Sequence, residues 1–166
     1  MKKLIFSMLF LFAGTSAMSA QDIFNAILED SKKVMNDSTS NIYQARIANF
    51  KYNALQYIKR KSFEQEGDVT KKFLDDQAYF MKEFISTFFS SALLNQDLSK
   101  SDKKARIMAF IDASGSNPLF NDPDKELVNA YVENSKGQFT PFSLDTDWVK
   151  AYAAIQSLLE AQDKQK

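Results

Sequence analysis

The stretch that decides the fold is Phe84–Leu94, "FISTFFSSALL", whose 11 positions contain no charged residue. Upstream of it, Phe73 and Phe80 share a helical face with Phe84, and apolar residues recur at spacings of three and four. This spacing predicts a helix from about Val69 to Leu94. Because its second half has no polar face to present to water, that half should be buried on most sides. We therefore expect this helix to be the hydrophobic centre of an all-α protein.

The rest of the chain is typical of helices separated by short gaps. Glycine and proline number only four and three in 166 residues, and they fall in a few places that punctuate the apolar periodicity. We expect a single all-helical domain in residues 21–166, built as a bundle of about six helices. The second and third helices should form a long antiparallel pair joined near Gly67. The expected helices cover about 22–36, 41–65, 69–94 and 99–114, a fifth beginning at Asp122–Pro123, and a sixth over about 145–162.

Local residues predict where several of these helices begin. The polar run "NDSTSN" at 36–41 suits a turn followed by a new N-cap. Asp68 can cap the third helix, and Ser99 with Asp102 has capping-box spacing. In "FTPFSLDTDW", residues 139–148, we expect Asp145 to be the N-cap of the last helix, with Leu144 and Val149 as a hydrophobic staple.

The first 20 residues have the layout of a secretory signal peptide. Lys2 and Lys3 precede an apolar run from Leu4 to Ala13, and small residues follow. That run has about ten residues, whereas a membrane-spanning helix needs roughly 20. We expect cleavage before Gln21 and a soluble periplasmic or secreted protein without an integral membrane segment. No cysteine follows the apolar run, so we do not expect a lipoprotein.

Composition narrows the possible functions. The whole chain carries 21 basic and 21 acidic residues; without Lys2 and Lys3 the bases fall to 19, and the net charge becomes about −2. Such a chain lacks the basic character of nucleic-acid binders. It contains no histidine and no cysteine, which excludes catalysis by Ser-His-Asp or Cys-His groups and the usual zinc sites. We predict no cofactor and no metal.

Carboxylate side chains would allow two less favoured functions, hydrolysis and Ca²⁺ binding. A hydrolase acting on sugars needs only two carboxylic groups flanking a cleft. Asp122 and Asp124 with Asp145 and Asp147 would alternatively supply oxygens for Ca²⁺, although the glycine and glutamate of an EF-hand loop do not follow Asp145. The glutamates available for hydrolysis are Glu64, Glu66, Glu83, Glu126 and Glu133.

The aromatic content gives the candidate binding surface. Phenylalanine, tyrosine and tryptophan make up 13% of the chain, which predicts an aromatic core. Some of these rings would alternatively line a groove for an apolar ligand or a partner helix. The candidate residues are Phe84, Phe88, Phe89, Leu93, Phe139, Phe142 and Trp148.

Together these observations favour an exported, non-enzymatic interaction module with a protein partner. A small protein that binds a lipid-like molecule is the first alternative, and the carboxylate-dependent hydrolase is the second. A basic patch on the second helix, Lys51, Lys59, Arg60 and Lys61, is either a solvated face or a docking surface for an acidic partner.

Overall fold

The computed structural model describes residues 22–66, 69–122 and 141–163. All regular structure in these ranges is helical, which confirms the all-α prediction. The elements are α1 (Ile23–Asn36), α2 (Ile42–Glu66), α3 (Lys71–Thr87), the π-helix η3 (Phe88–Leu93), α4 (Lys100–Gly115) and α6 (Trp148–Asp163). The described ranges thus hold five α-helices, not six, and the helix predicted to begin at Asp122–Pro123 lies in residues 123–140, outside them.

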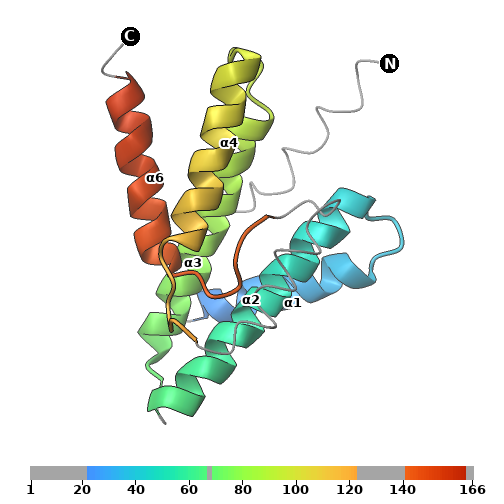
Figure 1. Ribbon diagram of the computed structural model, residues 1–166. Helices are drawn as coiled ribbons and strands as arrows, with labels where there is room; N and C mark the ends of the chain where they lie inside the picture. Colours follow the sequence, from blue (N-terminus) through green and yellow to red (C-terminus); the bar gives the residue numbers. More distant parts are fainter. Residues whose placement is uncertain (1–21, 67–68, 123–140, 164–166) are drawn as a thin grey trace.

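The helices form two groups (Figure 1). In the first group α3, α4 and α6 stand side by side, and the chain runs up α3, down α4 and up α6. In the second, α1 and α2 form an antiparallel hairpin that crosses beside the lower half of α3. The closest packing partners are α1 with α2 and α3 with α6. The expected long pairing of α2 with α3 is not confirmed, because these two helices contact each other less than either contacts its main partner.

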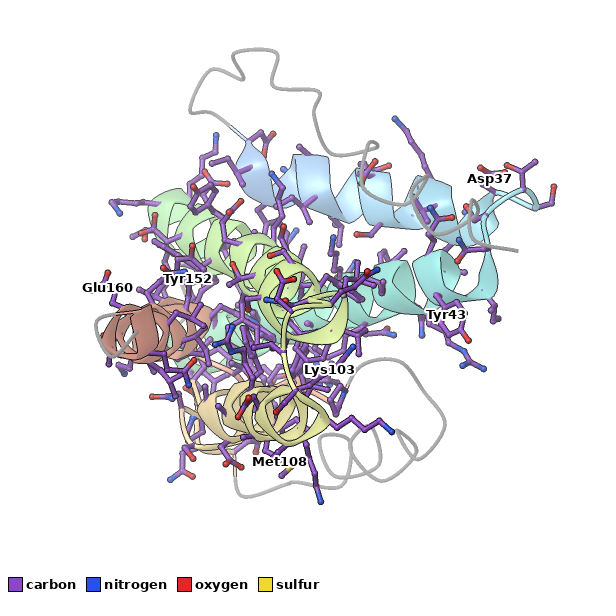
Figure 2. The ribbon with its side chains drawn as sticks, turned by 90° about the horizontal axis from the view of Figure 1, so that it is seen from above. Asp37, Tyr43, Lys103, Met108, Tyr152 and Glu160 are labelled. Carbon is purple, nitrogen blue, oxygen red and sulfur yellow. The ribbon has the colours of Figure 1, made fainter. Side chains whose placement is uncertain are left out.

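Figure 2 shows the same arrangement from above. The turn between α1 and α2, marked by Asp37 and Tyr43, projects to one side of the molecule. Tyr152 and Glu160 on α6 lie at the opposite side, and Met108 on α4 points away from the other helices. Among the described residues, no helix is both long and apolar enough to cross a membrane.

Side-chain caps fix several helix starts. The Asn41 carboxamide oxygen accepts from the backbone N–H groups of Tyr43 and Gln44 at 3.0 and 2.9 Å, so the predicted turn and cap before α2 are confirmed. The Ser99 hydroxyl accepts from the backbone N–H of Asp102 at 3.1 Å, as the capping-box spacing predicted. For α3 the cap is Thr70, whose hydroxyl accepts from Phe73 N–H; Asp68 lies outside the described residues.

α3 changes to π geometry in the uncharged stretch. The backbone N–H of Leu94 donates to the carbonyl of Phe89, five residues earlier, at 2.8 Å. Turns of this width keep residues four apart on nearly the same side. Phe84, Phe88 and Ala92 follow that spacing and are all buried. Ser86 and Ser90 in the same stretch are exposed, so this half is buried on one side and the prediction of burial on most sides is met only in part.

One cap comes from a different helix. Asp22 precedes α1 but makes no side-chain cap, and the Asp75 carboxylate on α3 instead accepts from the backbone N–H of Phe24 at 2.8 Å. Asp75 and Phe24 are both buried. A carboxylate at a helix N-terminus also interacts favourably with the helix dipole. This contact ties the start of α1 to α3.

Candidate functional site

The structure brings most of the predicted aromatic residues into the interior. Phe84, Phe142 and Trp148 have no exposed surface, and Phe88 is 4% exposed. Phe89 and Leu93, on η3, are partly buried and pack against the core. Phe139 lies outside the described residues. Segments far apart in the sequence, α3 with η3 and the loop before α6, therefore meet at the predicted place.

These rings contact one another directly. The ring centre of Phe84 lies 5.2 Å from that of Phe142 and 5.4 Å from that of Trp148, both edge to face. Phe88 and Phe142 are 5.1 Å apart in the same geometry. Such distances are those of rings in favourable contact. At this place the described rings pack directly against one another.

Two further rings complete the cluster, and sequence reasoning did not include either of them in the site. Phe110 on α4 lies 5.1 Å from Phe84, and Phe50 on α2 lies 5.9 Å from Trp148. Both are fully buried. Nothing in a single sequence pairs Phe50 with a residue 98 positions later.

The loop before α6 is held by a buried glutamine. The Gln77 side chain on α3 accepts from the backbone N–H of Trp148 at 2.9 Å and donates to the Asp147 carboxylate at 3.2 Å. Gln77 is 3% exposed. The indole N–H of Trp148 is buried and has no hydrogen-bond partner within the described ranges. A lone buried donor is costly, so the surrounding aromatic contacts must offset it.

The prediction that Asp145 caps the last helix is wrong. α6 begins at Trp148, and Asp147 is its cap: the Asp147 carboxylate accepts from Lys150 N–H at 3.3 Å. The Asp145 carboxylate instead accepts from the backbone N–H groups of Phe120 and Asp122, at 2.9 and 3.3 Å. With the cap moved, the expected staple of Leu144 and Val149 no longer has the required positions.

A hydroxyl cluster holds this loop in place up to Asp147. The hydroxyls of Thr146 and Ser114 lie 2.8 Å apart, and the backbone N–H of Ser143 donates to the Ser114 hydroxyl at 3.0 Å. The backbone N–H of Asp147 donates to the carbonyl of Asn117 at 2.7 Å. These bonds fasten the loop to the end of α4.

The acidic residues considered for Ca²⁺ are engaged with protein donors. The Asp122 carboxylate lies 2.5 Å from the Lys61 ammonium group, and that of Asp147 lies 2.9 Å from the Lys150 ammonium group. Burial would raise the pKa of Asp147, but hydrogen bonds from Lys150 and Gln77 outweigh it and the pKa is lowered. Asp124 lies outside the described residues. Within the described ranges no group of three potential metal ligands occurs.

The ionisable groups around Asp122 affect one another. Tyr57 donates to the Asp122 carboxylate at 3.5 Å, and burial, together with the charges of Asp145 and Asp122, raises the pKa of Tyr57 well above its ordinary value. The bond to Asp122 also raises the pKa of Lys61. Tyr57 therefore stays protonated and Lys61 stays charged across the neutral range, which suits a structural role.

Two of the glutamates considered for hydrolysis have described side chains, and these two lie on different helices. Glu64 lies in the last turns of α2, 3.5 Å from the Lys61 ammonium group. Glu83 lies in α3, 3.8 Å from that of Lys82. The Glu66 side chain, Glu126 and Glu133 lie outside the described residues.

The predicted basic patch is divided by the fold. Lys51 is buried, and burial lowers the pKa of its amine to about 8. Lys61 is paired with Asp122 and Glu64. Lys59 and Arg60 are exposed. Only these last two therefore remain available to an acidic partner.

Lys59 and Arg60 border a hollow that sequence reasoning missed. It is open to solvent, has a volume of about 550 Å³ and lies between the last turns of α2 and the first residues of α3. Phe63, at its edge, is 68% exposed. The hollow is lined by Gln56, Lys59, Arg60, Phe63, Glu64, Val69 and Leu74. The available signal was a phenylalanine on an otherwise polar face, at positions 56, 59, 60 and 63, whose spacing is that of one side of a helix.

Comparison with known proteins adds no relationship: no protein-family model matches the chain, and it has no significant similarity to a curated protein or to a solved structure.

Proposed function

We propose that this protein is an exported, non-enzymatic interaction module of the cell envelope or the secreted fraction, and that it works through its surface. The observation that carries the proposal is the filled aromatic interior. Phe84 has no exposed surface and contacts Phe110, Phe142 and Trp148 at ring-to-ring distances. A protein whose largest apolar cluster is occupied by its own side chains leaves its outer faces for recognition.

The polar groups of the interior support the same proposal. The chain lacks histidine and cysteine, so acid and base chemistry would depend on carboxylates, lysines or tyrosines. The buried carboxylates of Asp75, Asp145 and Asp147 accept hydrogen bonds from backbone N–H groups that hold helix starts or loops. These hydrogen bonds support a structural role for the three carboxylates.

The first alternative, an apolar ligand held by the predicted aromatic residues, has less support. Such a ligand would have to displace rings that already pack together, and deleting a whole buried phenylalanine ring typically costs roughly 3–5 kcal/mol. Phe89 and Leu93 are only partly buried and remain the members of that set nearest to the surface. They are the residues at which a lipid-like molecule would first be sought.

Export rests on the sequence of the first 20 residues, with their two lysines, apolar run and small residues. The test is to determine the N-terminal sequence of the protein recovered from cells producing the full chain. The proposal predicts a product beginning at Gln21 in the envelope or medium. A product that keeps Met1 and stays inside the cell would contradict it.

The interaction function is tested in cells with a photo-crosslinking amino acid placed at exposed positions on three faces: Tyr43, Phe63 and Met108. The proposal predicts a reproducible crosslinked product of one size from one position and not from the other two. Native mass spectrometry of the same preparation checks for a bound small molecule. No crosslink from any position, together with a small-molecule adduct, would overturn the proposal and favour the ligand-binding alternative.

A further inference from the structure

We propose that the hollow between α2 and α3 is the docking site for a peptide segment of a partner protein that presents a large apolar side chain next to a carboxylate. This inference rests on the proposed interaction function and names the surface and the chemistry of the partner. Three features carry it: an exposed apolar lining, cations at the rim, and the length of the helix face.

The apolar lining is provided by Phe63, Val69 and Leu74. Phe63 is the most exposed of the large hydrophobic residues in the described ranges, at 68%. Val69 and Leu74 are half-buried beside it. An apolar side chain entering the hollow would cover these surfaces and gain roughly 25 cal/mol for each Å² removed from water.

The rim carries positive charge that the described residues do not neutralise. Lys59 and Arg60 form no ion pair there, whereas Glu64, the acid of the lining, lies 3.5 Å from Lys61. Lys61 in turn is held by Asp122. Among these described side chains three cations face two acids, so the charge left for a partner is cationic. An arginine guanidinium can bind a carboxylate through two parallel hydrogen bonds.

The shape favours a peptide. Pockets for small apolar ligands bury most of the ligand surface, but this hollow is open to solvent. Its α2 side spans about two helical turns and consists of Gln56, Lys59, Arg60, Phe63 and Glu64. Peptides that bind such faces place anchors at matching helical spacings over a similar length.

The experiment selects peptides from a random display library on the mature protein, residues 21–166, and repeats the selection on two surface variants. Phe63→Ser removes the exposed ring, and Arg60→Glu reverses a rim charge. We expect the unaltered protein to enrich peptides in which aspartate or glutamate neighbours leucine or phenylalanine. A synthetic, fluorescently labelled copy of the most enriched peptide should bind each variant at least tenfold more weakly by fluorescence anisotropy.

Matched controls lie on a different helix. Met108→Ser and Lys104→Glu change an exposed apolar residue and an exposed cation on α4, and both should bind the labelled peptide like the unaltered protein. Far-ultraviolet circular dichroism should be the same for all four variants, because every substituted side chain is exposed. Added salt should weaken binding, since one attraction is between exposed charges.

Several results would overturn the inference. These are an absence of enriched peptides, enriched peptides without acidic residues, or equal loss of binding in the α4 controls. Vesicles containing phosphatidylglycerol that bind in an Arg60- and Phe63-dependent way, with no enriched peptide, would assign the hollow to a lipid surface instead. A crosslink in cells from Tyr43 or Met108, without peptide binding at the hollow, would reject this site and leave the broader interaction function standing.

Discussion

Lys51 shows what a single residue contributes in this fold. It lies on α2, is 7% exposed, and burial lowers the pKa of its amine to about 8; the charge of Asp30 acts to raise this pKa, and that of Lys82 acts to lower it. The ordinary pKa of a lysine is 10.5. The folded protein therefore binds fewer protons than the unfolded chain between about pH 8 and 10.5.

The sign of the pH effect follows from that difference. Stability should rise with pH through this window, and the contribution of Lys51 to it should total about 3 kcal/mol. Urea unfolding at pH 7.5 and pH 10 should show the rise in the unaltered protein and lose it in Lys51→Met. Comparing the two proteins at each pH cancels the opposing effect of Tyr57, whose raised pKa disfavours the folded state above pH 10. If the stability of both proteins depended on pH in the same way, the burial of the Lys51 amine would be contradicted.

Gln77 is a second single residue whose replacement should lower the free energy of unfolding. Gln77→Ala would leave the backbone N–H of Trp148 without its acceptor and remove a donor to Asp147. We expect a loss of about 1–3 kcal/mol in the free energy of unfolding, because an unsatisfied buried group keeps its full desolvation cost. Gln65→Ala, at an exposed position of α2, is the control and should change stability by less than about 0.5 kcal/mol. Similar losses in both variants would show that the Gln77 bonds are not needed.

At the scale of elements, α3 with η3 connects the two groups of helices. Arg106 on α4 fastens η3: its guanidinium donates to the carbonyl of Ser91 at 3.1 Å and to the side chain of Gln162 on α6. It thus joins the π-helix, α4 and the end of α6. Such a three-way contact depends on the forked geometry of arginine, which a lysine does not have.

Replacing Arg106 should loosen this junction. We expect Arg106→Met to lower stability by about 1–3 kcal/mol, and Arg106→Lys to recover only part of it, because one ammonium group does not reproduce both bonds. Hydrogen exchange should speed up at residues 156–163 of α6. The control Lys104→Met, at an exposed position of α4, should leave exchange unchanged. Unaltered exchange at the end of α6 in Arg106→Met would refute the junction.

Most helix boundaries could be predicted because their causes are local. The apolar spacing and the caps Asn41 and Ser99 lie within a few residues of the starts they fix. The start of α6 could not be predicted, because the partners of Asp145 lie 25 and 23 residues earlier in the chain. The same holds for the cap that Asp75 gives to Phe24, 51 residues away.

The candidate site was predicted in part for the same reason. Phe84, Phe88, Phe142 and Trp148 do come together, since the uncharged segment and the aromatic-rich segment before the last helix had to bury their rings in one small domain. Whether these rings enclose a space depends on Phe50 and Phe110, which come from other helices. The spacing of residues along one helix does not predict which rings of other helices it will contact. The hollow at Phe63 depends on how α3 begins relative to the end of α2, which is also a tertiary feature.

For the whole molecule, the central claim is that the aromatic interior is closed and that recognition takes place outside it. Trp148 reports on this directly, because it is the chain's only tryptophan and has no exposed surface. The decisive measurement is acrylamide quenching of its fluorescence in a protein of residues 21–166, with and without decanoate. A closed interior predicts blue-shifted emission, quenching far below that of free tryptophan, and no response to decanoate. Efficient quenching, or an emission that shifts as decanoate binds, would contradict it.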